Sequence, residues 1–225
     1  MFMKRLFYLG LIAMFASCIK PDPVAPVGEI KVRFVNSVLS STPQDIFIRG
    51  VKVPNSVAVP YGQYSPYYST SSGDISLAFA NAGVSEGVGN AGFGGSIDIG
   101  SNISMYYFKK QKVQNTEGAL AAAVVFDDLT PVAGKAKVRF IHLNTFLINF
   151  INIKKGDGAI LSEGIAFTNS SAYFQVDPGT KFSLNATGLV EPLVVDPNVQ
   201  AGKNYTIWID GPSDSVLVSH TILHN

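Results

Sequence analysis

Alternating apolar and polar residues mark several short segments of this chain and predict β-strands. In residues 30–34, Ile30, Val32 and Phe34 alternate with Lys31 and Arg33. Successive side chains of a strand point to opposite faces, so this pattern predicts one buried face and one face in water. No stretch keeps a helical period, and we therefore expect an all-β fold.

Further strands are expected where Val, Ile, Phe, Tyr and Thr gather between turn signals such as Ser72-Gly73 and Pro178-Gly179. In the first half of the chain these segments are 45–49, 56–59, 75–80, 104–109 and 121–126. In the second half they are 148–154, 164–168, 181–186, 205–210 and 215–223. Six or seven short strands per ~100 residues are typical of a β-sandwich.

One strand plan occurs twice along the chain. Residues 31–36, KVRFVN, return as residues 137–142, KVRFIH, 106 positions later, and Tyr67 matches Tyr173 at the same offset. Because order and spacing are kept, we predict two homologous domains, residues 29–131 and 132–225. We expect each to fold on its own as an immunoglobulin-like antiparallel β-sandwich, with a linker around Pro131.

The N-terminus has the order of parts of a secretory signal. Lys4 and Arg5 precede an apolar stretch, residues 6–15, which is too short for the ~20 residues of a membrane helix. Ala16-Ser17-Cys18 then fits a lipoprotein cleavage site, although Phe15 stands where such sites usually have Leu. We predict a signal peptide at 1–17, a lipid on Cys18 and a stiff proline-rich tether at 18–28.

Composition and charge narrow the function classes. Apolar residues make up 47% of the chain, enough for a sizeable core, and Cys18 is its one cysteine, so no intrachain disulfide can form. Removal of Lys4 and Arg5 leaves 15 basic and 16 acidic residues. Nucleic-acid binding needs a concentrated basic face, which this balance does not indicate. The expected location is the cell envelope, on either face of the outer membrane.

Three sequence blocks resemble a known family. Val32-Arg33-Phe34-Val35-Asn36, Tyr61-Gly62-x-x-Ser65-x-Tyr67 and Gly202-x-x-Tyr205-Thr206 are similar to the bacterial domain of unknown function 4397, which is common in Bacteroidetes lipoproteins as tandem copies. The resemblance covers roughly residues 29–225, but the second copy has Phe167-Thr168 in place of Tyr-Gly. It implies an envelope β-sandwich with no established activity and supplies no catalytic residues.

Two motifs suggest chemistry but lack its structural context. Residues 87–92 spell G-x-G-x-x-G, yet a strand-like segment follows instead of the helix that dinucleotide binding requires, so we expect a flexible glycine-rich loop. Asp127-Asp128 could bind calcium at the domain junction. Calcium usually needs six to eight oxygen ligands, and adjacent acids in a linker are more often solvated.

The histidines do not have the spacing of metal ligands. They are His142, His220 and His224, and no cysteine lies near them in the sequence. A site that joins His220 and His224 with Asp210 or Asp214 is conceivable. We predict no catalytic residues, no cofactor and no metal.

Tyrosines gather between residues 61 and 68 and offer apolar rings with polar tips for a ligand. They are Tyr61, Tyr64, Tyr67 and Tyr68. Tyr64 and Tyr68 are the candidate ligand-binding residues, since neither has a partner in the second repeat. If Tyr67 points inward, both should point outward, and Pro66 would confine the strand to an edge. The alternative is that all four rings pack the edge of the sandwich.

The pattern as a whole predicts a membrane-anchored envelope lipoprotein with a binding or structural role towards a glycan or protein partner. The other function class, which stays open, is an envelope hydrolase or a metal-dependent enzyme with an unrecognised site.

Lipidation gives the first testable prediction. Changing Cys18 to Ala should move the protein from the membrane fraction to the soluble fraction and abolish its labelling with palmitate, because the acceptor thiol is lost. Unchanged fractionation together with unchanged palmitate labelling would contradict the prediction.

Overall fold

The computed structural model describes residues 26–84, 89–114 and 116–225. The signal peptide, Cys18 and the tether up to residue 25 lie outside the described residues, so the predictions made for them stay predictions. Among the residues described, all regular structure is β-strand. None of these residues forms a helix of the length and apolar character that a membrane span needs.

The first sandwich consists of two four-stranded sheets with the orders β4-β1-β7-β8 and β3-β2-β5-β6. Its strands are β1 (Glu29–Asn36), β2 (Gln44–Ile48), β3 (Val51–Lys52), β4 (Tyr68–Ser71), β5 (Gly73–Asn81), β6 (Ala91–Ile97), β7 (Asn102–Lys109) and β8 (Leu120–Phe126). Phe34, Phe79 and Tyr107 meet at its centre, with ring centroids 5.4 Å and 5.2 Å apart.

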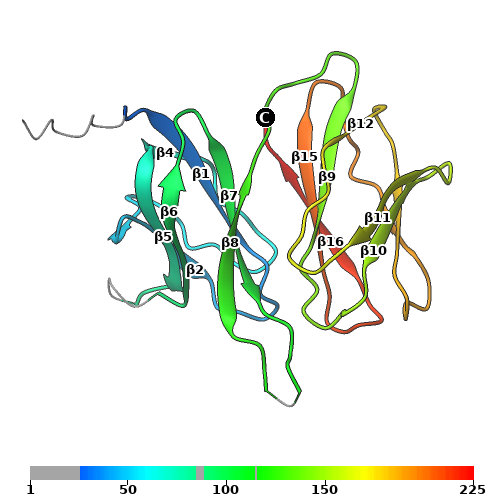
Figure 1. Ribbon diagram of the computed structural model, residues 1–225, viewed down its shortest axis with the longest axis horizontal. Coiled ribbons are helices and arrows are strands. Elements are labelled where there is room, and N and C mark those ends of the chain that lie inside the picture. Colours follow the sequence, from blue (N-terminus) through cyan, green and yellow to red (C-terminus); the bar gives the residue numbers. More distant parts are fainter. Residues whose placement is uncertain (1–25, 85–88, 115) are drawn as a thin grey trace, which may run out of the picture.

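The second sandwich repeats this plan with the orders β12-β9-β15-β16 and β11-β10-β13-β14. Its strands are β9 (Ala136–His142), β10 (Ile151–Lys155), β11 (Ile160–Ile165), β12 (Phe174–Val176), β13 (Phe182–Asn185), β14 (Leu193–Val195), β15 (Asn204–Asp210) and β16 (Val218–Leu223). Phe140 and Phe182 pack edge to face in its core, 5.1 Å apart. Figure 1 shows the two sandwiches side by side.

The prediction of two β-sandwiches is confirmed, but the prediction of purely antiparallel sheets is wrong. β1 pairs with β7 in parallel, and β9 pairs with β15 in parallel. Each such pair joins the first strand of a repeat to a strand near its end, so the chain has room for the long connection that parallel pairing requires. The pairings do not confirm the immunoglobulin-like assignment.

A third apolar cluster joins the two sandwiches, between the sheet of β1 and the sheet of β9. Its buried members are Val35, Tyr106, Phe108, Ile141, Leu143, Trp208 and Ile222. Tyr106 of the first sandwich meets Trp208 of the second edge to face, with ring centroids 6.4 Å apart. The domains therefore share a core in addition to their own two.

This shared core overturns the expectation of a polar face in water for most of the opening strands, although Lys31 stays exposed. Arg33, Lys137 and Arg139 are only 5%, 6% and 3% exposed. Period-two alternation distinguishes the two faces of a strand, but it does not reveal what covers the polar one. Here the second sandwich covers the polar face of the first, and the reverse also holds.

The glycine-rich segment is another correction, because part of it forms a strand. Residues 91–97 are β6 and pair with β5 along its length. A Cβ on Gly92 would lie 3.0 Å from the carbonyl oxygen of Leu77, so the glycine permits this close approach. A strand, not a helix, thus begins within the G-x-G-x-x-G motif, whose first two residues lie outside the described residues.

Other strand predictions are shifted or missed. Residues 56–59 contribute only an isolated bridge, between Val59 and Gln44. The strand expected at 164–168 lies earlier, at β11. The short strands β3, β4, β12 and β14 were not predicted, because two to four residues are too few to show a period.

Trp208, the single tryptophan, tests the shared core. Residues 132–225 prepared alone should keep a β-type circular dichroism spectrum, as the second sandwich has its own core. Its tryptophan emission should shift to longer wavelength than in the two-domain chain, because Tyr106 no longer covers the indole. An unshifted emission maximum with the β spectrum retained would show that Trp208 does not report a domain interface.

Candidate functional site

Two equivalent arginines reach across the domain interface. Arg33 on β1 donates from Nη1 to the carbonyl oxygen of Leu223 at the end of β16, at 3.3 Å. Arg139 on β9 donates from Nη1 to the carbonyl oxygen of Phe126 at the end of β8, at 2.5 Å. Each repeat thus sends the same side chain to the same place on the other. The interface has the reciprocal pattern of a symmetric dimer, formed within one chain.

A closed ring of hydrogen bonds crosses this interface, and we call its members, Arg139, Thr206, His224, Tyr67 and Asp127, the interface ring. Arg139 Nε donates to Thr206 Oγ1 at 2.9 Å, and that oxygen lies 2.7 Å from His224 Nε2. His224 Nδ1 lies 2.8 Å from the Tyr67 hydroxyl, which donates to Asp127 Oδ2 at 2.7 Å. An ion pair between Arg139 and Asp127 closes the ring.

His224 Nδ1 lies between two groups of the first sandwich. The Tyr67 oxygen is 2.8 Å away, and Arg33 Nη1, which can only donate, is 3.3 Å away. The proton of the Tyr67 hydroxyl goes to Asp127 Oδ2.

The surroundings of the ring favour a neutral His224 and a protonated Tyr67. Burial lowers the pKa of His224 to about 2, and the positive charges of Arg33 and Arg139 act in the same direction. Burial raises the pKa of Tyr67, with a further contribution from Asp127, which keeps the phenol protonated. Burial also raises the pKa of Asp127, against the opposing effects of Arg139, Ser104, Tyr67 and Arg33.

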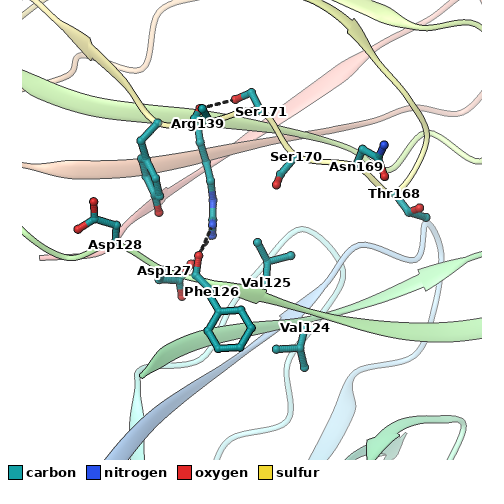
Figure 2. A pocket seen from close by; sticks show the side chains of 12 residues that line it. Val124, Val125, Phe126, Asp127, Asp128, Arg139, Thr168, Asn169, Ser170 and Ser171 are labelled. Carbon is teal, nitrogen blue, oxygen red and sulfur yellow. Dashed lines mark hydrogen bonds and ion pairs between the residues drawn. The ribbon is translucent and has the colours of Figure 1, made fainter. Parts of the chain in front are cut away.

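An open groove lies beside the ring, between the end of β8 and the loop that leads into β12. We call it the inter-domain groove, and its volume is about 660 Å³. Figure 2 shows Val124–Phe126 on one wall and Thr168–Ser171 on the other, with Arg139 reaching towards Asp127 between them. Its lining is completed by Asp128, Ala172 and Tyr173. The ring of Phe126 is 58% exposed here, and the groove therefore joins an accessible aromatic surface to hydroxyl and amide groups.

The family model described as Domain of unknown function (DUF4397) matches residues 30–147, which is more than half of the chain. The chain belongs to this family. The predicted family is thereby confirmed, and the matched residues span the first sandwich, the linker and β9. No curated protein matches the chain.

Nine chains of solved structures are similar to the DUF4397 protein. One of them is the Bacillus anthracis TIE protein, which is 13% identical in sequence. The match covers 82% of this chain and 34% of that one, with a TM-score of 0.23. The chain thus spans about a third of that protein's length.

Tyr64 and Tyr68 of this DUF4397 chain do not form the expected outward pair. Tyr64 packs against the shared core, whereas Tyr68 packs against the core of the first sandwich. Tyr64 and Tyr67 lie on the same side instead, with their rings 4.9 Å and 4.0 Å from the Arg33 guanidinium carbon. Residues 63–65 pair with β1 before β4 begins, so the regular alternation assumed from Tyr64 to Tyr68 is interrupted. Tyr64 and Tyr68 cannot act as one stacking platform, and a ligand role for either ring stays a prediction.

The histidines and acids suggested as a site in this DUF4397 chain do not come together in one place. His220 Nε2 lies 3.0 Å from Asp210 Oδ1, so this pair of the suggested site is present, but His224 belongs to the interface ring. His220 also stacks on Trp208, 4.6 Å between centroids. Within the described residues no group of three or more His, Cys, Asp or Glu could hold a metal ion.

The acids at the junction correct the expectation of a solvated linker. The side chain of Asp127 is fully buried against Arg139, and the half-exposed Asp128 pairs with Lys137. Because each carboxylate already faces a basic side chain, the pair does not present the free oxygens that calcium needs. Sequence reasoning missed the groove, although one signal was present: the second repeat departs from the family pattern at Phe167-Thr168, next to the groove wall.

Variants of the two neighbouring acids measure how much the interface ring contributes to the free energy of unfolding. Asp127→Asn should lower the free energy of unfolding by about 3–5 kcal/mol, because Arg139 is left buried without its counter-charge. Asp128→Asn removes a partly exposed ion pair and should cost about 1 kcal/mol or less. Urea unfolding followed by Trp208 fluorescence at neutral pH measures both. Equal costs for the two variants would contradict the assigned role of Asp127.

Proposed function

We propose that this protein is a lipid-anchored lipoprotein of the bacterial cell envelope that binds a glycan or protein partner and catalyses no reaction. The anchor rests on the order of charge, apolar stretch and Ala16-Ser17-Cys18. Ile19 follows the cysteine, where an aspartate would signal retention in the inner membrane of enterobacteria, and this favours the outer membrane.

The inter-domain groove carries the binding proposal. Its volume of about 660 Å³ lies within the usual range of ligand sites, and its two walls belong to different sandwiches. The interface ring and the shared core fix those walls relative to each other. A partner therefore meets a preformed surface and does not have to order it, which favours affinity.

The groove lining suits a glycan or an extended peptide. The exposed ring of Phe126 can stack on an apolar face, while Asn169 and Ser170 offer an amide and a hydroxyl for hydrogen bonds.

The charged groups of the groove favour binding over catalysis. A general base or nucleophile must be free to exchange a proton with the substrate. Asp127 is held by Arg139, Tyr67 and Ser104, whose hydroxyl donates to it at 2.6 Å. These contacts engage the carboxylate in the interface, so it is not free to act as a general base.

Exposed groove residues provide the test. A Phe126→Ala, Asn169→Ala double variant of the mature chain should keep the wild-type melting temperature, since both side chains are exposed. Its binding to isolated cell envelopes should fall by about ten-fold or more, as expected when an anchor ring is lost. The matched control is Val57→Ala, which removes an apolar side chain that is 82% exposed and does not line the groove.

Treating the envelopes with protease or with glycosidases then identifies the partner class, because only one treatment should remove the binding. Wild-type binding by the double variant would contradict the groove as the site. Equal losses in the double variant and the Val57 control would contradict it as well.

A further inference from the structure

The two repeats differ at one position that decides whether the space beside their arginine is filled. Residue 64 makes an isolated backbone bridge to Val35 of β1, and residue 170 makes the same bridge to Ile141 of β9. The next residue is a serine in both repeats, and Ser65 and Ser171 accept from the backbone amides of Phe34 and Phe140, at 3.0 and 2.9 Å. Residues 64 and 170 are therefore structurally equivalent.

These equivalent positions hold a tyrosine in the first repeat and a serine in the second. The Tyr64 ring lies 4.9 Å from the guanidinium carbon of Arg33 and packs on the shared core. Ser170 leaves the corresponding place beside Arg139 without a ring, and the inter-domain groove is open there, lined by both residues. In each repeat the second ring is present, Tyr67 for Arg33 and Tyr173 for Arg139.

The groove also borders the edge of a sheet. β8 is the last strand in the order β4-β1-β7-β8, and its residues Val124–Phe126 line the groove. An edge strand carries backbone N–H and C=O groups that an additional extended segment can pair with. The groove thus combines the outer edge of strand β8 with a space that an aromatic ring fills in the first repeat.

We propose that the groove binds an extended peptide segment of a partner protein and takes up one aromatic side chain of that segment against Arg139. The ring occupies the place that Tyr64 occupies beside Arg33, and the cationic guanidinium attracts its face. This inference rests on the proposed binding function of the groove and names the partner class. A glycan ligand is the competing outcome.

Two blocked peptides test the proposal, acetyl-Thr-Val-Tyr-Val-Thr-amide and the same peptide with Ala in place of Tyr. Titrations followed by amide chemical shifts should show that the Tyr peptide binds the mature wild-type chain with a dissociation constant of about 1 mM or below. The shifts should centre on Val124, Phe126 and Ser170. The Ala peptide should bind about ten-fold more weakly, since it lacks the ring.

Ser170→Tyr is the decisive variant, because it copies the first repeat and fills the groove from within. It should keep or raise the melting temperature and abolish binding of the Tyr peptide. Ser170→Ala is the matched control, which leaves the space open and should bind as the wild type does. If Ser170→Tyr fails to fold, the shift map and the difference between the two peptides on the wild-type chain still decide the question.

Three results would overturn the inference: no binding of the Tyr peptide at about 1 mM, equal affinity for both peptides, or unchanged binding by a folded Ser170→Tyr chain. Envelope binding that is lost in the Phe126→Ala, Asn169→Ala variant, together with no peptide binding, would leave the groove as a site but exclude this ligand. If the double variant binds envelopes as the wild type does and the Tyr peptide does not bind, the groove is not a binding site.

Discussion

The ion pair between Arg139 and Asp127 is the interaction on which the arrangement of the two sandwiches depends. Both side chains are buried, and a buried charge is costly unless an opposite charge and hydrogen bonds accompany it. The two partners come from different sandwiches, so neither domain alone can satisfy its own charge. Tyr67, Thr206 and His224 extend the pair into a ring that includes side chains of both repeats. The face that each domain buries at the interface is therefore stable only when the two domains are docked.

The repeats meet almost as two copies in a symmetric dimer, and the exceptions to that symmetry lie beside the inter-domain groove. Arg33 and Arg139 make reciprocal contacts, yet one faces His224 and the other Asp127. Tyr64 fills the space beside Arg33, whereas Ser170 leaves the corresponding space beside Arg139 open. Since both repeats use the same frame, these differences are not required by the fold. They distinguish the filled space of the first repeat from the open groove of the second.

The side chains that hold the two sandwiches together also line the groove proposed for binding. Asp127 and Arg139 do both, so the docking of the sandwiches fixes the position of the groove lining. The edge strand β8 and the loop 168–171 form walls that belong to different sandwiches but cannot move apart without breaking the ring. The groove is thereby kept in one shape, which reduces the ordering that binding would otherwise require.

Local pattern alone determined most strands of the two cores, the repeated strand plan and the family, but it missed β6. Alternation at Ile30, Val32 and Phe34 identifies a buried face because side-chain direction in a strand follows from the backbone. The same pattern assigned Arg33 and Arg139 to water, and the linker position of Asp127 suggested a solvated acid. Only the tertiary structure decided otherwise, since what covers a polar face depends on how two distant segments dock. A pattern read along one strand contains no information about that second surface.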